Sequence, residues 1–334
     1  MTQSISVDEL ARNFGGYSQG DVLSIDIGGS VDLPVKVDPA AGSDALIVVF
    51  HGAVNRDKRP YPAFLNFRAG LGHAAHQIAI ADAALGLDPE LPLSWYAGAP
   101  GLPLQELLPP LFHKLQYELQ VEKLIFMGSS GGGFAALFYS WHCPGSVAIV
   151  QVPQTNILEY HLPGAFRRYS AVCWPEGGSS NEFAPILDLR ELYTMDSGNS
   201  VVYIQSTLDG HHLHRQMLPF LASLPAGMNG RVVVKSSFWG RTGHSNVVPN
   251  SEWDGWAKAA LAAESLDAES LVLAYEALAI EKVPKVGRNR SPVGLKAAGT
   301  ASRTNSSVRQ HHDDQDLAWA NLVAESQLAA YGVQ

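Results

Sequence analysis

Cysteine is scarce in this sequence, with Cys143 and Cys173 the only two in 334 residues. Two cysteines cannot build the disulfide framework of a small secreted domain, and they exclude a zinc site made of four thiolates. The first residues, "MTQSISVDELARNFGG", contain acidic side chains and no apolar core, unlike a signal peptide. The sequence therefore predicts a cytoplasmic protein.

Positive charge is also in short supply. The chain has 23 Lys and Arg residues against 32 Asp and Glu residues, a net charge of −9, which predicts no nucleic-acid partner. No apolar run approaches the roughly 18 residues of a membrane helix, so no membrane span is expected. His211, His212 and His214 are closely spaced, but no carboxylate or cysteine pattern accompanies them, and we expect neither a metal nor a cofactor.

Short apolar runs are what the sequence has in quantity. The segment "DVLSIDIGGSVDLPVKV" (21–37) alternates apolar and polar residues around two glycines, which predicts an antiparallel hairpin. Continuous apolar runs, typical of strands buried on both faces of a parallel sheet, lie at 45–52, 77–85, 123–128, 146–152, 200–206 and 231–237.

Helical patterns separate several of these runs, at 104–119, 134–142, 214–224 and 252–264. Alternating strands and helices predict an α/β protein of three layers, with a mainly parallel central sheet and an antiparallel N-terminal hairpin. We expect one such domain over residues 1–282, in which 156–197 breaks the rhythm and forms a cap. A polar linker is expected at 283–314 and an amphipathic helix at 315–331, through which copies of the chain could associate.

The segment "LIFMGSSGGGFAAL" (124–137) joins a predicted strand to a predicted helix through glycines and serines. Gly128 to Gly132 read G-x-S-x-G centred on Ser130, the pattern of a nucleophile elbow. Ser129 fails the same test because Met127 stands two positions before it. Small flanking residues let strand and helix approach closely around a strained turn, so Ser130 is the predicted nucleophile.

A serine hydroxyl needs a base and a group that orients that base. Asp209 follows the predicted strand 200–206, and His244 follows the next one, 231–237, so both leave the same edge of the sheet as Ser130. We predict Asp209 as the acid and His244 as the base. His211, His212 and His214 are too near Asp209 in sequence to be expected as its partner, and Asp188 and Asp196 are rival acids that no strong strand run precedes.

The amides of an oxyanion hole come from the residue after the nucleophile and from the loop after an early central strand. The first is Gly131. The second is Ala53, because "VVFHGAV" (48–54) ends a buried strand at His51 and Gly52. His51 itself is expected to pack in the loop rather than to transfer a proton.

The segments "VVFHGAV", "GSSGG", "STLDG" and "TGHSN" occur in that order, and over roughly residues 20–265 the chain resembles the α/β-hydrolase fold superfamily. The resemblance implies acyl transfer through Ser130, with His244 as base and acid and Asp209 as its orienter. It does not identify a family, and the oxyanion loop lacks the H-G-G-G form of many lipases and esterases.

Several functions are compatible with these residues. The first is a serine hydrolase that cleaves a carboxylic ester of a small-molecule or carbohydrate-linked acyl group. The second is an O-acyltransferase, in which a carbohydrate or small alcohol takes the same acyl group. A serine peptidase, a non-catalytic scaffold and a sugar-kinase phosphate loop at "DIGGS" (26–30) are weaker alternatives, the last because that segment is a predicted hairpin turn.

Candidate substrate-binding residues flank the predicted triad. Arg56 lies just beyond the oxyanion loop, in a basic segment that could attract an anionic or sugar substrate, although such clusters are commonly only solvated. Trp239, five positions before His244, is the preferred wall of an acyl pocket over Trp95 and Trp174, which core packing explains equally well.

Overall fold

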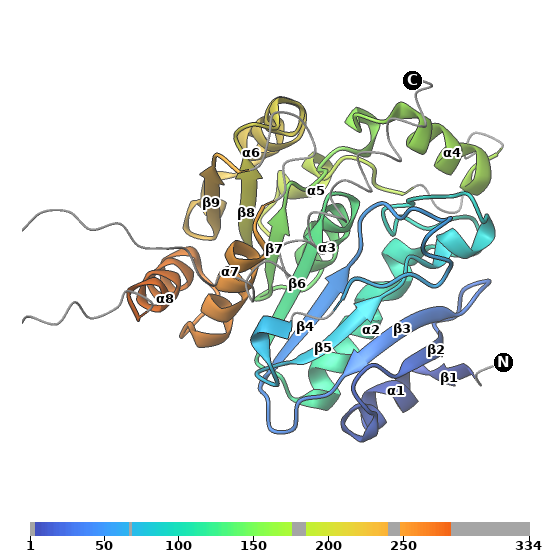
Figure 1. The fold of residues 1–334 in the computed structure, drawn as a ribbon, viewed down its shortest axis with the longest axis horizontal. Coiled ribbons are helices and arrows are strands. Elements are labelled where there is room, and N and C mark those ends of the chain that lie inside the picture. The colour runs from blue at the N-terminus through green and yellow to red at the C-terminus, as the bar shows by residue number, and fades with distance from the viewer. Residues whose placement is uncertain (1–3, 67–68, 176–184, 240–247, 282–334) are drawn as a thin grey trace, which may run out of the picture. The chain divides into compact units, whose positions relative to one another are not determined.

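A computed structural model of the chain describes residues 4–66, 69–175, 185–239 and 248–281 (Figure 1). The chain divides into two units, residues 1–275 and 276–334. The first contains the whole sheet, and of the second only residues 276–281, the end of one helix, are described. The predicted linker (283–314) and terminal helix (315–331) lie outside the described residues.

The described residues form one nine-stranded sheet in the order β1-β2-β3-β5-β4-β6-β7-β8-β9. Strand β3 pairs antiparallel with β2 and β5, and every other neighbouring pair is parallel. The strands are β1 (Ser4–Ser6), β2 (Val22–Asp26), β3 (Leu33–Asp38), β4 (Ala45–Phe50), β5 (His76–Ile80), β6 (Lys123–Ser129), β7 (Val147–Gln151), β8 (Ser200–Ser206) and β9 (Val232–Ser237).

The predicted hairpin and all six predicted strands are present. The prediction of burial on both faces is wrong for 231–237, because β9 lies at the edge of the sheet, none of its residues is buried and Val234 is exposed. Ile25 of β2 lies opposite Leu33 of β3, and every residue of β4, β5, β7 and β8 is buried. Continuous apolar runs thus occupy the centre of the sheet, where both faces are covered. The three residues of β1, too short for a pattern, were not predicted.

Helices cover both faces of the sheet, as three layers require. They are α1 (Val7–Asn13), α2 (Leu104–Leu119), α3 (Gly131–Trp141), α4 (Pro163–Cys173), α5 (Arg190–Tyr193), α6 (Leu218–Ser223), α7 (Asn250–Ala262) and α8 (Ala268–Glu281). A π-helix, η5 (His212–Met217), precedes α6, and short 3₁₀ turns include η3 (Ala83–Leu87) and η4 (Ile157–Glu159). None of the described helices combines the length and apolarity needed to cross a bilayer.

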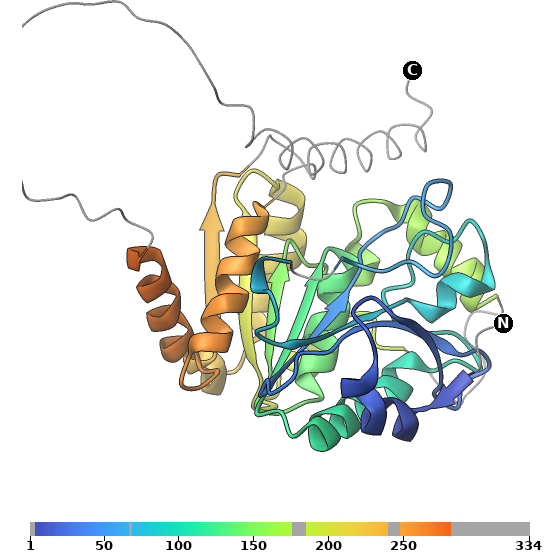
Figure 2. The same cartoon turned by 60° about the horizontal axis from the view of Figure 1, so that its bottom comes forward.

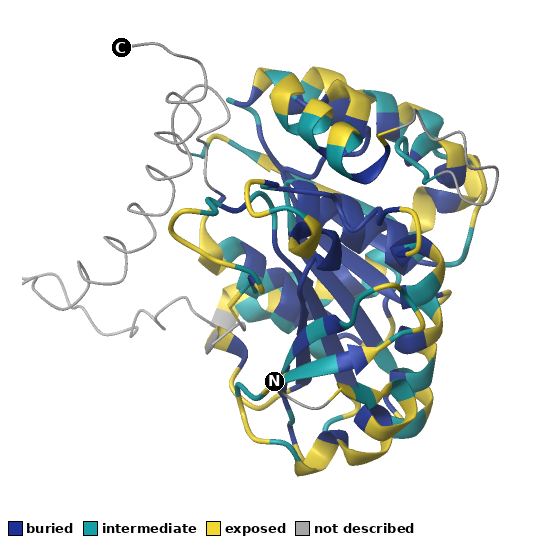
Figure 3. Cartoon of the chain, turned by 90° about the vertical axis from the view of Figure 1, so that its right-hand side faces the viewer, coloured by how far each residue is buried: buried dark blue, intermediate teal, exposed yellow. Residues whose placement is uncertain are grey.

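Alternation along the strands assigns side chains to the two faces. Phe50 and Phe126 pack with Phe112 of α2 and Tyr139 of α3 in one aromatic cluster. Helix α7 packs on β6 and β7 (Figure 2). There the indole Nε1 of Trp253 donates a 3.0 Å hydrogen bond to the carbonyl of Ile149. The central strands are accordingly buried between helices whose outer faces are exposed (Figure 3). The polar side chains that could form a catalytic site are therefore found in the loops at the ends of the strands.

Candidate active site

Ser130 occupies a strained turn between β6 and α3. Its φ of 54° and ψ of −120° place a non-glycine residue in a region that costs of the order of 1–3 kcal/mol. A Cβ at Gly128 would lie 1.9 Å from the carbonyl oxygen of Gly132, and one at Gly132 would lie 2.4 Å from that of Phe50. The predicted strained strand-to-helix turn is therefore present, and its glycines are there because no side chain fits.

The loop after β4 touches this turn. A Cβ at Gly52 would lie 3.4 Å from the Cβ of Ser130 and 3.8 Å from the amide nitrogen of Gly131. Within the described part of the chain, the amides of Ala53 and Gly131 donate no hydrogen bond. The two amides that the sequence predicts for an oxyanion hole thus belong to adjacent segments beside Ser130, and both N–H groups are available for a ligand.

His51 fixes the orientation of this loop. Its Nε2 accepts a 3.3 Å hydrogen bond from the amide of Asp82, so the ring proton is on Nδ1, which lies 2.7 Å from the carbonyl oxygen of Gly52. Burial lowers the pKa of His51 to about 4, which keeps the ring neutral near pH 7. Because carbonyl and N–H point in opposite directions across a trans peptide, holding the Gly52 carbonyl sets the direction of the Ala53 N–H. His51 packs in the loop, as expected.

A buried carboxylate supports the next loop. Asp82 is fully buried and accepts hydrogen bonds from the Ser94 hydroxyl and from the amides of Ser94 and Tyr96. Burial raises the pKa of Asp82 to about 6 in spite of these donors. The loop needs such support because Trp95 and Tyr96 both have positive φ, near 55°.

Gln154 is a residue of the site that the sequence reasoning missed. It follows β7 and is completely buried, and its Nε2 donates a 3.0 Å hydrogen bond to the Oγ of Ser130. Its backbone amide also donates to the carbonyl of Ser130 at 3.1 Å. The available signal was positional, since "QTN" (154–156) follows a buried strand at the same sheet edge as Ser130.

Asp209 follows β8 and is 1% exposed. One carboxylate oxygen accepts the amide of His212 at 3.1 Å, a helix-capping contact, and the other lies 3.0 Å from His212 Nδ1. Together with burial, its negative charge raises the pKa of Tyr203 on β8 well above 10. Asp209 is thus a buried acid at the carboxyl edge of the sheet, as its place after a strand predicts.

The expectation that His212 is too near Asp209 in sequence to be its partner is wrong as to contact, because the two side chains lie 3.0 Å apart. Side chains three positions apart share one face of a helix, and the pair meets where η5 begins. A carboxylate has lone pairs for about four hydrogen bonds, so this contact leaves capacity for a second imidazole. His244 belongs to residues 240–247, outside the described residues.

The rival acids are engaged elsewhere. Asp188 accepts hydrogen bonds from the Arg190 guanidinium and from the Asn156 side chain at 3.0 Å. Asp196 forms an ion pair with Arg231. Neither carboxylate touches Ser130 or Gln154 among the contacts of the described residues.

A buried glutamine ties η5 to the loop that carries Gln154. The Oε1 of Gln216 accepts the amides of Thr155 at 2.7 Å and Asn156 at 2.8 Å, and its Nε2 donates to the carbonyl of Glu159 at 3.0 Å. The loop after β7 is therefore joined to the helix that begins beside Asp209. π-Helical turns are rare and are frequent at functional sites.

The described part of the predicted cap packs onto Trp95. The rings of Tyr160 and Tyr169 meet the Trp95 indole edge-on, with centroids 5.6 and 5.7 Å away. Arg168 of α4 pairs with Asp88 at 2.7 Å. Residues 156–175 thus cover the loop that follows β5, and that these segments form a cap over substrate stays a prediction.

The two predicted substrate-binding residues lie on loops at the same sheet edge. Arg56 follows β4; burial lowers its pKa, and its Nε and Nη1 are buried without an acceptor among the described residues. Trp239 lies two residues after β9, and its carbonyl accepts a 2.9 Å hydrogen bond from the Ser206 hydroxyl. No contact in the described residues brings either side chain to Ser130.

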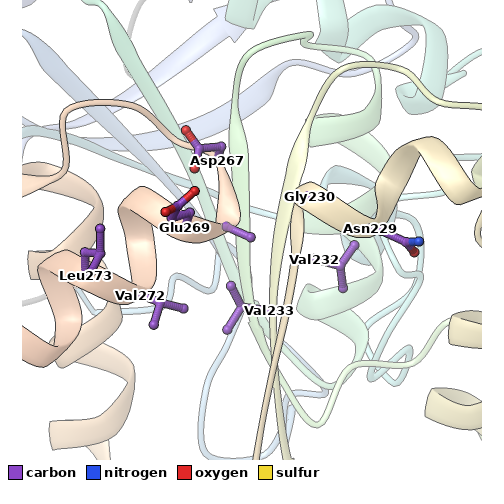
Figure 4. Close-up of a pocket in the computed structure, with 9 residues that line it drawn as sticks. Asn229, Gly230, Val232, Val233, Asp267, Glu269, Val272 and Leu273 are labelled. Atoms are coloured by element: carbon purple, nitrogen blue, oxygen red, sulfur yellow. The ribbon is translucent and has the colours of Figure 1, made fainter.

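An open pocket lies at the other end of the sheet (Figure 4). Gly230 and Val232, at the amino end of β9, and Val272 and Leu273 of α8 belong to its lining. Because the candidate residues follow the carboxyl ends of strands, this pocket is not part of the site. Within the described ranges, no group of three or more His, Cys, Asp or Glu side chains is placed to hold a metal ion.

No protein-family model matches the sequence, and a search of curated protein sequences finds no relative. Among solved structures, the capsule O-acetyltransferase of Neisseria meningitidis serogroup A is similar with a TM-score of 0.50 at 12% identity, over 74% of this chain and 97% of that one. An acylaminoacyl peptidase gives 0.48 at 16% identity over 71% and 40%. Proline iminopeptidase from Mycobacterium smegmatis gives 0.40 at 14% over 77% and 100%.

At 12% identity, the similarity to the O-acetyltransferase structure is one of fold and not of activity. The sheet agrees with that similarity, since a hairpin leads into a mainly parallel sheet whose sixth strand ends in a strained serine turn. The chain therefore has the α/β-hydrolase fold.

Proposed function

We propose that this protein is a serine hydrolase that cleaves a carboxylic ester through an acyl-enzyme on Ser130. The observation that carries the proposal is the strained conformation of Ser130, held at the sheet edge beside the amides of Ala53 and Gly131, which donate no hydrogen bond to any described residue. Strain of 1–3 kcal/mol at one residue is retained where it presents a group for chemistry.

His244 acts as the base and Asp209 as its orienter. The Oγ of Ser130 attacks the ester carbonyl as its proton passes to His244, and the charge on the carbonyl oxygen is stabilised by the amides of Ala53 and Gly131. His244 then protonates the leaving alcohol. Water attacks the acyl-enzyme, gives its proton to His244, and releases the acid and Ser130.

The thiols of the chain are poor rivals for this role. Burial raises the pKa of both Cys143 and Cys173 to about 12, so neither is a thiolate near neutral pH. The thiolate is the reactive form of cysteine, which favours Ser130 as the nucleophile.

The second candidate is an O-acyltransferase that moves the acyl group to a carbohydrate or small alcohol. The same acyl-enzyme serves both reactions, and the two differ in whether water or an alcohol attacks it. This alternative is supported by the similarity to an enzyme named capsule O-acetyltransferase, which extends over 97% of that chain.

We propose Arg56 as a determinant of the substrate. A guanidinium with two buried nitrogens that have no acceptor among the described residues gains hydrogen bonds when an anionic or hydroxyl-rich group approaches. Trp239 is proposed as a wall of the acyl pocket, because it lies in the loop between β9 and His244, two residues after the strand ends. The substrate is accordingly a small-molecule or carbohydrate-linked acyl ester.

The test is turnover of p-nitrophenyl acetate by the full chain, with and without acceptor alcohols. The parent should release p-nitrophenolate and carry one acetyl group, located by mass spectrometry on the peptide that contains Ser130. Ser130→Ala should lose both, while Ser129→Ala should keep both. Acetylated alcohol formed in preference to acetate would select the transferase, and acetyl on another residue would overturn the proposal.

A further inference from the structure

The side chain of Gln154 is aimed at the nucleophile from a fully buried position. Its Nε2 lies 3.0 Å from Ser130 Oγ, and the backbone of Gln154 is held by the Ser130 carbonyl. A buried amide has few alternative partners, so this contact is a fixed part of the site.

The orientation of the Gln154 amide is determined by Trp95. The indole Nε1 of Trp95 donates a hydrogen bond to Oε1 of Gln154. Because an indole N–H can only donate, the atom that faces it must be the amide oxygen, and the NH₂ group must face Ser130. Trp95 is itself fully buried between Tyr160 and Tyr169.

This assignment constrains the serine hydroxyl. An NH₂ group donates and does not accept, so Ser130 Oγ must be the acceptor of this hydrogen bond. The hydroxyl proton cannot be given to Gln154 and is left for the general base. Gln154 thereby selects the hydroxyl orientation from which proton transfer proceeds.

We propose that Gln154 is a further catalytic residue, one that donates to Ser130 Oγ and stabilises charge on that atom when the acyl-enzyme breaks down. The proposal rests on the proposed acyl-enzyme mechanism. During breakdown, water adds to the acyl carbonyl and its proton goes to the base. The bond between carbon and Oγ then breaks, the electron pair stays on Oγ, and the base returns the proton to Oγ.

The donor matters more in this step than in acylation. In the resting enzyme the Ser130 hydroxyl already accepts a hydrogen bond from Gln154. This hydrogen bond stabilises the starting state of acylation, so it does little to speed that step. In the acyl-enzyme Oγ is an ester oxygen, which is a weaker hydrogen-bond acceptor than a hydroxyl. During breakdown negative charge develops on Oγ, so the hydrogen bond from Gln154 becomes stronger. An interaction speeds a step only if it is stronger in the transition state than in the ground state. Loss of the donor should slow breakdown by about tenfold or more and acylation by no more than about threefold.

The experiment uses the full chain, p-nitrophenyl acetate and the substitution Gln154→Met, which keeps the length of the side chain and removes the donor. The matched control is Gln105→Met. Gln105 is also a buried glutamine, its side chain makes two hydrogen bonds to the backbone of Ile186, and no hydrogen bond among the described residues joins it to Ser130. The burst rate reports acylation, and the steady-state rate and acetylated fraction report breakdown.

Gln154→Met should keep a fast burst, lose steady-state turnover and accumulate acetylated Ser130, while Gln105→Met behaves as the parent. A parent-like acetylated fraction in Gln154→Met would overturn the inference. If the parent forms acetyl-Ser130 and only this comparison fails, the proposed function stands without it. If the parent forms none, the proposed function fails first.

A second variant covers the case in which Gln154→Met does not fold. Gln154→Glu has the same shape and still accepts from Trp95, and its buried carboxyl donates to Ser130 Oγ only when protonated. Its turnover should therefore fall, relative to the parent, as pH rises, and recover toward the parent at low pH. A pH profile parallel to the parent's would contradict the role, because a purely structural glutamine gives no such dependence.

Discussion

At the scale of single residues, Asp209 can be separated experimentally from every other acid considered for the site. Asp209→Asn should lower kcat by about 10⁴-fold, because an amide holds the imidazole of His244 in the wrong tautomer. Asp188→Asn and Asp196→Asn should stay within about tenfold of the parent, since their carboxylates pair with Arg190 and Arg231. Steady-state kinetics on the three variants decide this, and a nearly active Asp209→Asn would show that the acid is wrong.

His51 makes the stability of the chain depend on pH. Burial lowers its pKa from 6.5 to about 4, so its contribution is complete above pH 6.5 and is lost as pH falls toward 4. Asp82 has the opposite sign, because a pKa raised from 3.8 to about 6 favours the folded state at low pH. The two dependences oppose each other between pH 4 and 6.

Replacing His51 should remove its contribution to the pH dependence of the unfolding free energy. The loss of unfolding free energy caused by His51→Asn should be about 2 kcal/mol smaller at pH 5 than at pH 7.5, from 1.5 pH units at 1.36 kcal/mol each. Urea denaturation of parent and variant at the two pH values measures it. A loss that is the same at both would mean that His51 is not buried in its neutral form.

At the scale of elements, the turn from β6 to α3 tolerates no side chain on its glycines. Gly128→Ala would place a Cβ 1.9 Å from the Gly132 carbonyl oxygen, which requires the strand and helix to separate. We expect it to lower the free energy of unfolding by at least about 2 kcal/mol. The control is Gly16→Ala, whose Cβ would meet nothing within 4 Å and should change stability by less than about 1 kcal/mol.

Thermal and urea denaturation of the two glycine variants test this prediction. Equal stability of Gly128→Ala and the parent would mean that strand and helix do not approach as closely as the turn shows. Retained stability with lost turnover would separate the geometry of the elbow from the folding of the sheet.

The central strands, the hairpin and the turn at Ser130 were predictable from the sequence. Strands buried on both faces consist of apolar residues, and a turn where two backbones approach closely requires glycine. The contacts of Gln154, Gln216 and His212 were not, since each joins a polar side chain to a segment that only the folded sheet brings near. The contact of Asp209 with His212 had a local signal in "DGHH" (209–212), an acidic cap before a helix, and was overlooked. Helix α8, apolar on several faces, gave no clear period.

At the scale of the whole molecule, every candidate site residue lies in the first unit, residues 1–275. A chain that ends at residue 282 should therefore keep its turnover of p-nitrophenyl acetate within about threefold, because no predicted catalytic group is removed. Activity and circular dichroism of the shortened chain should be compared with those of the full chain. A folded but inactive product would show that residues beyond 282 help to build the site.

Whether Ser130 is an activated nucleophile can be tested by labelling the full chain with a fluorophosphonate, followed by mass spectrometry of the digested protein. Such a probe phosphonylates a serine only where a base and an oxyanion hole activate it. We predict one label, on Ser130, which is lost in Ser130→Ala and kept in Ser129→Ala. A label that persists in Ser130→Ala, or no label on a folded parent chain, would contradict this prediction.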